Sequence, residues 1–76
     1  MAYYKNGNFL IHQDGAEFDV LHQPGHNTPI SGIYRCVVCG LSCTSVKDHH
    51  FPPQNHHQHP QGAAIRWQLV VKSHWI

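Results

Sequence analysis

The most constraining feature of this chain is residues 48–62, which read DHHFPPQNHHQHPQG. The segment holds five of the chain's nine histidines and three of its five prolines, with almost no apolar residue. Proline removes a backbone donor and fixes φ, so this stretch cannot form an ordinary core helix or central strand. Histidine at this density is typical of metal binding. Because the segment cannot supply a core helix or strand, it indicates a fold that a bound metal stabilises.

A chain of 76 residues forms one domain at most, and its core is small. Ordering it costs on the order of 110 kcal/mol at roughly 1.5 kcal/mol per residue, which apolar burial alone barely offsets at this size. An added crosslink is expected. Three cysteines cannot all pair, and no signal peptide is recognised, so we expect reduced thiols and a cytoplasmic protein. No apolar run approaches the roughly 18 residues of a membrane span.

Short strand-like segments predict a small all-β fold. Gly32–Cys36 and Leu41–Val46 flank a turn at CVVCG and are rich in residues that suit strands, which predicts a hairpin. Residues Ile65–Lys72 alternate, with Ile65, Trp67, Leu69 and Val71 on one face, and predict a third strand. No helix of ten or more periodic residues is found.

The N-terminal part predicts an arm. Asn6-Gly7 lies between apolar residues and suits a two-residue hairpin turn, so we expect a β-hairpin of Ala2–Lys5 with Asn8–His12. Residues 1–31 would form this hairpin arm and a loop, and residues 32–76 a zinc ribbon, together making one small domain of residues 1–76.

Two local pairs carry the expected chemistry. Cys36 and Cys39 form C-x2-C followed by Gly40, and His56 and His59 form H-x2-H. Two ligands three residues apart on a tight turn can aim both donor atoms at one point, and glycine permits the positive φ that such a turn needs at its exit. Two thiolates and two imidazoles suit tetrahedral Zn2+, so we predict a zinc site formed by Cys36, Cys39, His56 and His59.

Other residues compete for this role. His57 with His59 makes an H-x-H pair that could also chelate, although His56 mirrors the cysteine spacing better. Cys43 could supply a third sulfur, but strand alternation favours a small buried apolar residue there. We interpret His49 and His50 as solvated loop side chains.

Three motifs together resemble a known group of proteins. They are SGIYRCxxCG at residues 31–40, PPxNHHxH at 52–59 and IRWxLVV at 65–71. The chain resembles short bacterial zinc-ribbon proteins of the protein L kind, and the resemblance covers most of its length. It implies that Cys36 and Cys39 form the first zinc knuckle and that His56 and His59 form the second. It implies no activity.

The expected function is that of a small structural zinc-binding protein, a non-catalytic interaction module or adaptor with a protein partner. A nucleic-acid-binding ribbon is the alternative, because residues 32–76 carry a net charge of +3 and aromatic residues lie near the termini, although no Lys/Arg cluster is present. A metal-handling or sensing protein using the extra histidines is another alternative. We expect no enzyme, because Asp48 is the only carboxylate side chain after Asp19.

Overall fold

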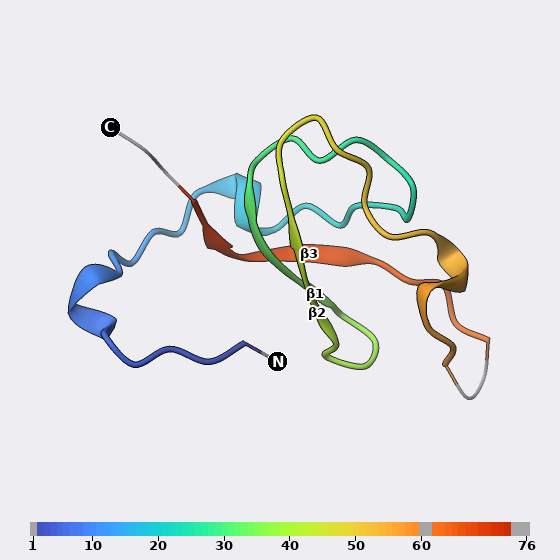
Figure 1. Ribbon diagram of the computed structural model, residues 1–76, viewed down its shortest axis with the longest axis horizontal. Coiled ribbons are helices and arrows are strands. Elements are labelled where there is room, and N and C mark those ends of the chain that lie inside the picture. Colours follow the sequence, from blue (N-terminus) through green and yellow to red (C-terminus); the bar gives the residue numbers. More distant parts are fainter. Residues whose placement is uncertain (1, 60–61, 74–76) are drawn as a thin grey trace.

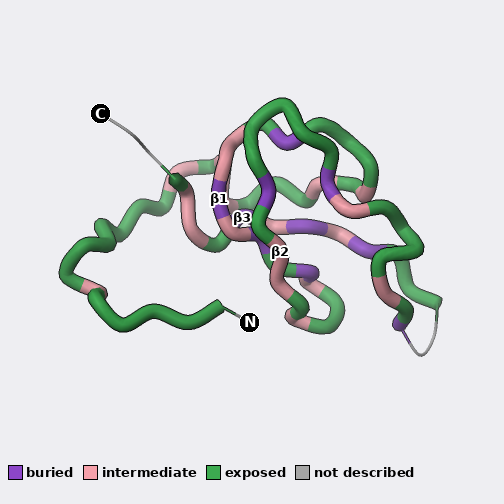
Figure 2. The backbone as a smooth tube through the Cα atoms, in the orientation of Figure 1, coloured by how far each residue is buried: buried purple, intermediate pink, exposed green. Residues whose placement is uncertain are grey.

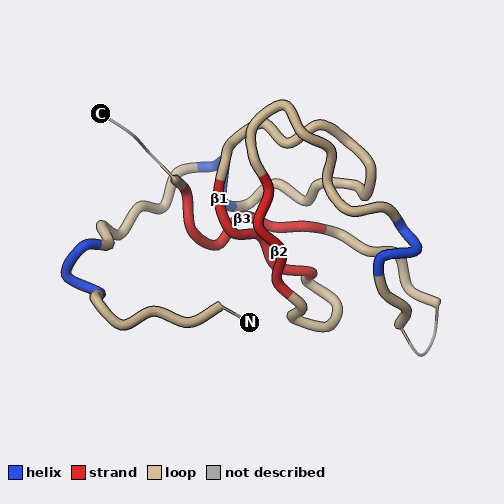
Figure 3. The backbone as a smooth tube through the Cα atoms, in the orientation of Figure 1, coloured by secondary structure: helices blue, strands red, loops and turns tan. Residues whose placement is uncertain are grey.

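The computed structural model describes residues 2–59 and 62–73 and contains one three-stranded antiparallel sheet in the order β2-β1-β3 (Figure 1). The strands are β1 (Gly32–Cys36), β2 (Ser42–Ser45) and β3 (Trp67–Lys72). Three short 3-10 turns, η1 (Gly7–Phe9), η2 (Ala16–Phe18) and η3 (Gln54–His56), complete the regular structure of the described residues. Loops make up most of the chain (Figure 3), and the expected small β fold is confirmed.

The predicted central hairpin is present. β1 pairs with β2 from Gly32 opposite Ser45 to Arg35 opposite Ser42. The other edge of β1 pairs with β3, which places Cys36 opposite Trp67. The predicted third strand is therefore also confirmed, although its ladder begins at Trp67, two residues later than the alternation suggested.

A register shift in the β1–β3 ladder explains why the expected apolar face of β3 is incomplete. Ile33 lies opposite Val71 and Tyr34 lies opposite Leu69, so Val70 is an extra residue between them. Such a bulge re-aims the side chains that follow it. Trp67 and Leu69 are buried as predicted, whereas Val71 is only half-buried.

One small core lies against the sheet, seen as buried segments of β1, β3 and the adjoining loops in Figure 2. Its buried apolar side chains come from the strands and from two flanking loop positions: Tyr34, Cys36, Phe51, Ile65, Trp67 and Leu69. Phe51 belongs to the His-rich segment, which in its described residues forms no core helix or strand but contributes this one side chain to the core. Its ring packs edge to face on Tyr34, with centroids 4.7 Å apart. Phe51 thus connects the polar loop to the core.

Two loops pair with each other beside the sheet. The Thr28 N–H donates to the carbonyl of His49 (2.7 Å), and the Asp48 N–H donates to the carbonyl of Thr28 (2.9 Å). Further along, the Phe51 N–H donates to the carbonyl of His26 (2.9 Å). Thr28 is fully buried, and its hydroxyl is hydrogen-bonded to that of Ser45. These bonds hold residues 26–28 against residues 48–51 and, through Ser45, against β2.

The predicted N-terminal hairpin is wrong. Residues 7–9 form η1, in which the Phe9 N–H donates to the carbonyl of Asn6 and the Leu10 N–H donates to that of Gly7. Gly7 does not use a positive φ. An isolated two-stranded hairpin is marginal in water, and Tyr3 and Tyr4 have no core to bury against that would fix a register.

The molecule is elongated, with extents of 38 × 25 × 19 Å. The N-terminal arm leaves the sheet at one end of the long axis, and the loop that follows η3 lies at the other end (Figure 1). Within the described part of the chain, no helix is long and apolar enough to cross a membrane.

Candidate metal centre

The turn between β1 and β2 positions the two cysteines. The Gly40 N–H donates to the carbonyl of Cys36, and the Cys36 N–H donates to that of Leu41, both at 2.8 Å. Gly40 has a φ of +83°, the positive value expected directly after the second cysteine. The turn leaves Cys36 buried and Cys39 exposed, so one sulfur faces the core and the other lies at the surface.

The segment after η3 positions two histidines. η3 ends at His56, and His57 then has extended backbone with φ −155° and ψ 165°. In extended backbone, side chains two residues apart point to the same side. Although the chain bends at His57, His57 and His59 do face together, with their Nε2 atoms 3.2 Å apart.

The donor atoms of Cys36, Cys39, His57 and His59 lie within 4.8 Å of one another. The Cys36 Sγ to His59 Nε2 and Cys39 Sγ to His57 Nε2 distances are both 3.5 Å. With bonds of about 2.3 Å to sulfur and about 2.05 Å to nitrogen, a tetrahedron has S···N edges of about 3.6 Å and N···N edges of about 3.3 Å. These two S···N distances and the N···N distance match those edges, although the 4.8 Å limit for the whole set is wider than a tetrahedron around zinc. The cluster could hold a metal ion.

The structure brings together three of the four residues assigned as ligands from the sequence. Cys36, Cys39 and His59 belong to the cluster, while His57 stands where His56 was expected. The H-x-H alternative is the arrangement found. The spacing preference for His56 assumed a second tight turn like that of the cysteines, but the chain is already extended at His57.

Cys43 lies outside the cluster. It is opposite Tyr34 on the neighbouring strand and packs against the core. Burial raises the pKa of its thiol to about 11. A thiol held neutral in this way behaves as a small apolar side chain, in agreement with the interpretation from strand alternation.

The surroundings of Cys36 favour its thiolate. Burial raises the pKa of this thiol, but hydrogen bonds from the backbone of Arg66, Val38 and Cys39 and from the ring of His57 lower it more strongly, to about 6. Donors aimed at a sulfur stabilise its negative charge. The thiolate, which is the form that binds metals, is therefore favoured here at neutral pH.

Hydrogen bonds on the far side of the imidazole rings orient both histidines. His59 Nδ1 lies 2.7 Å from the carbonyl oxygen of Ala63 and donates to it, because a carbonyl only accepts. That bond leaves the Nε2 lone pair of His59 free to face the cluster. His57 Nδ1 lies 2.9 Å from His56 Nδ1. When His57 donates in this pair, its Nε2 can bind a metal in place of the hydrogen bond that it makes to the Cys36 sulfur. His56 thus contacts a cluster residue without joining the cluster.

Buried Trp67 forms one wall beside these rings, with its centroid 5.8 Å from that of His57 and 5.7 Å from that of His56. Trp67 also lies opposite Cys36 in the β1–β3 ladder. It therefore adjoins both the cysteine side and the histidine side of the cluster.

Comparison with known proteins gives one informative match. The chain is 58% identical over 52 residues to "Protein L" of Escherichia coli, a stretch that covers 68% of this chain and 60% of that protein. The name states neither a ligand nor an activity. No protein-family model matches the chain, and no solved structure matches it. The predicted similarity to Protein L is confirmed, and the matched stretch spans less than two thirds of that protein.

Proposed function

We propose that this chain is a structural zinc-binding protein of the zinc-ribbon type, with Cys36, Cys39, His57 and His59 as ligands. One observation carries the proposal: four donor atoms from two separate segments lie within 4.8 Å of one another, and two S···N distances and the N···N distance are near those of a tetrahedral S2N2 site. Two thiolates and two neutral imidazoles suit Zn2+ in both geometry and softness. The thiolates also cancel the ion's charge, which permits a partly buried site.

Zinc would serve here as a crosslink. The two cysteines lie at the turn between β1 and β2, and the two histidines lie in the loop between η3 and β3. The ion would therefore crosslink this turn to this loop. Structural zinc sites contribute about 10–16 kcal/mol of apparent binding free energy in finger peptides. That exceeds the ~5 kcal/mol or less that so small a core supplies by itself.

The proposed role is non-catalytic. Catalytic zinc sites keep a coordination position open for water or substrate, whereas four protein donors fill a tetrahedral shell. Within residues 2–59 and 62–73, no carboxylate belongs to the cluster that would act as an acid or base. We therefore propose an interaction module with a protein partner, in which the metal keeps the surface rigid.

The test is metal content together with X-ray absorption at the zinc edge. We expect one equivalent of zinc per chain, bound by two sulfurs and two nitrogens. Cys39→Ser, an exposed position, should lose tight binding, whereas Cys43→Ser should retain one equivalent. Purified protein that folds cooperatively without metal, in the presence of a strong chelator, would contradict the proposal.

A further inference from the structure

The four donor residues of the cluster differ in their exposure to solvent. Cys36 and His59 are buried and His57 is half-buried, whereas Cys39 is exposed. Val38, which precedes Cys39 in the turn between β1 and β2, is itself 48% exposed. A small reagent in solution therefore reaches the cluster first at the Cys39 sulfur, and the reactivity of an exposed thiolate is the first thing to consider there.

The Cys39 sulfur has a second sulfur within reach. Cys36 and Cys39 lie in one tight turn, which the hydrogen bond from the Gly40 N–H to the Cys36 carbonyl closes at 2.8 Å. Their Sγ atoms are among the four donor atoms that lie within 4.8 Å of one another. Cys43 does not belong to this set and packs against the core from β2. An exposed cysteine beside a second one that can trap its oxidised form is the arrangement of redox-sensing cysteines.

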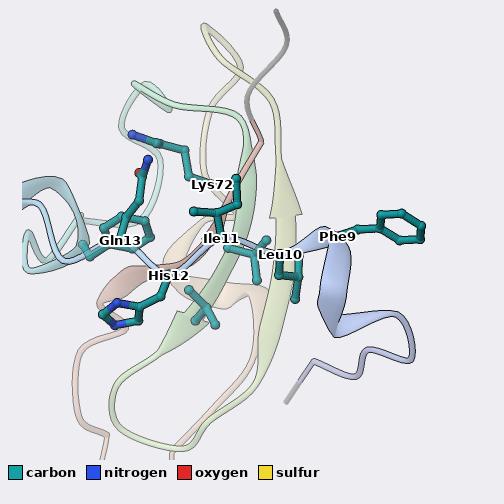
Figure 4. Close-up of a pocket in the computed structure, with 9 residues that line it drawn as sticks. Phe9, Leu10, Ile11, His12, Gln13 and Lys72 are labelled. Atoms are coloured by element: carbon teal, nitrogen blue, oxygen red, sulfur yellow. The ribbon is translucent and has the colours of Figure 1, made fainter.

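The apolar groove beside β3 is separate from these sulfurs. It has a volume of about 470 Å³ and lies between residues 9–13 and the end of β3, where Figure 4 shows Leu10 and Ile11. None of the residues that line it belongs to the cluster. The Cys39 sulfur lies at the open surface instead, and an oxidant that needs no binding pocket, such as hydrogen peroxide, fits this setting best.

We propose that the two cysteines form a redox switch, in which hydrogen peroxide converts the metal-binding pair into a Cys36–Cys39 disulfide; the inference rests on the zinc site proposed above. The Cys39 thiolate attacks one oxygen of the peroxide, the O–O bond breaks, and the products are a Cys39 sulfenic acid and hydroxide. The Cys36 thiolate then attacks the Cys39 sulfur, forms the S–S bond and expels a second hydroxide. Two protons from solvent convert both hydroxides into water, and the two electrons that reduce the peroxide come from the sulfurs.

Oxidation removes two of the four donors. The thiolate is the form of cysteine that binds metals, so a disulfide leaves only His57 and His59 to hold the ion. These histidines contact the turn between β1 and β2 through the same two sulfurs, at 3.5 Å each. The disulfide therefore releases the ion and undoes the crosslink between the turn and the loop after η3. Reduction reverses the change, because exposed disulfides are the labile ones.

Stoichiometric oxidation of the zinc-loaded protein tests the switch. One equivalent of hydrogen peroxide should release one equivalent of zinc per chain, measured with a chromophoric zinc indicator. Mass spectrometry after acid quenching should find a Cys36–Cys39 disulfide with the Cys43 thiol still free. A phosphine reductant with added zinc should restore the bound ion. Cys43→Ser is the matched control, because Cys43 lies outside the cluster; it should bind one equivalent before oxidation and release it at the wild-type rate.

The zinc content before oxidation separates a failure of the switch from a failure of the zinc site. Protein that binds no zinc contradicts both the site and the switch. Protein that binds one equivalent and keeps it under several equivalents of peroxide contradicts the switch alone. Release with a sulfinic acid at Cys39, or with a disulfide that includes Cys43, also overturns the switch, because either product shows that Cys36 does not trap the oxidised sulfur.

Discussion

Replacing each of two adjacent histidines separately by alanine distinguishes a metal ligand from the residue that orients it. His57 Nε2 stands 3.5 Å from Cys39 Sγ, within the cluster, whereas His56 lies outside the cluster and approaches Nδ1 of the His57 ring. If four ligands share about 12 kcal/mol of binding free energy equally, loss of one costs about 3 kcal/mol. At about 1.4 kcal/mol per factor of ten, His57→Ala should weaken zinc binding by roughly 150-fold.

His56→Ala should have a much smaller effect. Removing a partner that orients a ligand costs about 10–100-fold in metal affinity, and the exposed position of His56 favours the lower end of that range. We therefore expect the dissociation constants of the two variants to differ by roughly 15-fold. The ratio of the two zinc dissociation constants therefore tests whether His57 or His56 presents its Nε2 atom to the sulfur atoms.

Competition with a chromophoric zinc chelator at neutral pH measures both constants on the same scale. His49→Ala is the control, because His49 is exposed and hydrogen-bonds only through its backbone. It should bind zinc as the wild type does. Equal losses for the two variants, or a larger loss for His56→Ala, would refute the assignment of His57 and restore the H-x2-H pair.

Three further outcomes are expected. Tyr34→Phe removes the hydroxyl that donates to the Ile30 carbonyl at 2.6 Å and should cost about 1 kcal/mol, seen as a melting temperature lower by about 4–8 °C. In metal-free protein, iodoacetamide at pH 8 should alkylate Cys39 well before Cys43, since burial raises the Cys43 pKa to about 11; comparable rates followed by mass spectrometry would contradict this. Burial and, to a smaller degree, the charge of His26 lower the pKa of His22 in the folded protein. As the pH falls below about 6.5, the unfolded chain therefore binds a proton at His22 before the folded protein does, and the free energy of unfolding decreases. His22→Phe keeps a ring stacked on Phe51 and should lose less stability than the wild type between pH 7 and 5.5 in urea denaturation; parallel curves would argue against this.

The three-stranded sheet was predictable because its sequence signals agree with one another. Strand-forming residues, the C-x2-C turn and Gly40 all favour the same hairpin, and the observed β1 has the predicted bounds. The alternation of residues 65–72 also identified the buried face up to Leu69. The bulge at Val70 was not visible in the pattern, because it depends on how β3 pairs with β1 rather than on β3 itself.

The arm was mispredicted because a turn signal alone does not make a hairpin. Asn6-Gly7 favours a tight reversal, but two strands need a buried face to fix their register. Ile11 and both tyrosines remain exposed in the described chain, so tertiary packing gives the hairpin no support.

The choice between His56 and His57 shows where a spacing argument stops. Sequence separation limits which residues can reach one point, and both H-x2-H and H-x-H satisfy that limit. The backbone decides between them: a turn favours ligands three apart, whereas an extended chain favours ligands two apart. Here Pro53 precedes η3, the 3-10 turn ends at His56, and extended backbone begins at His57. His56, which ends the turn, therefore approaches the ring of His57, whereas His57 and His59 face the cysteine sulfurs.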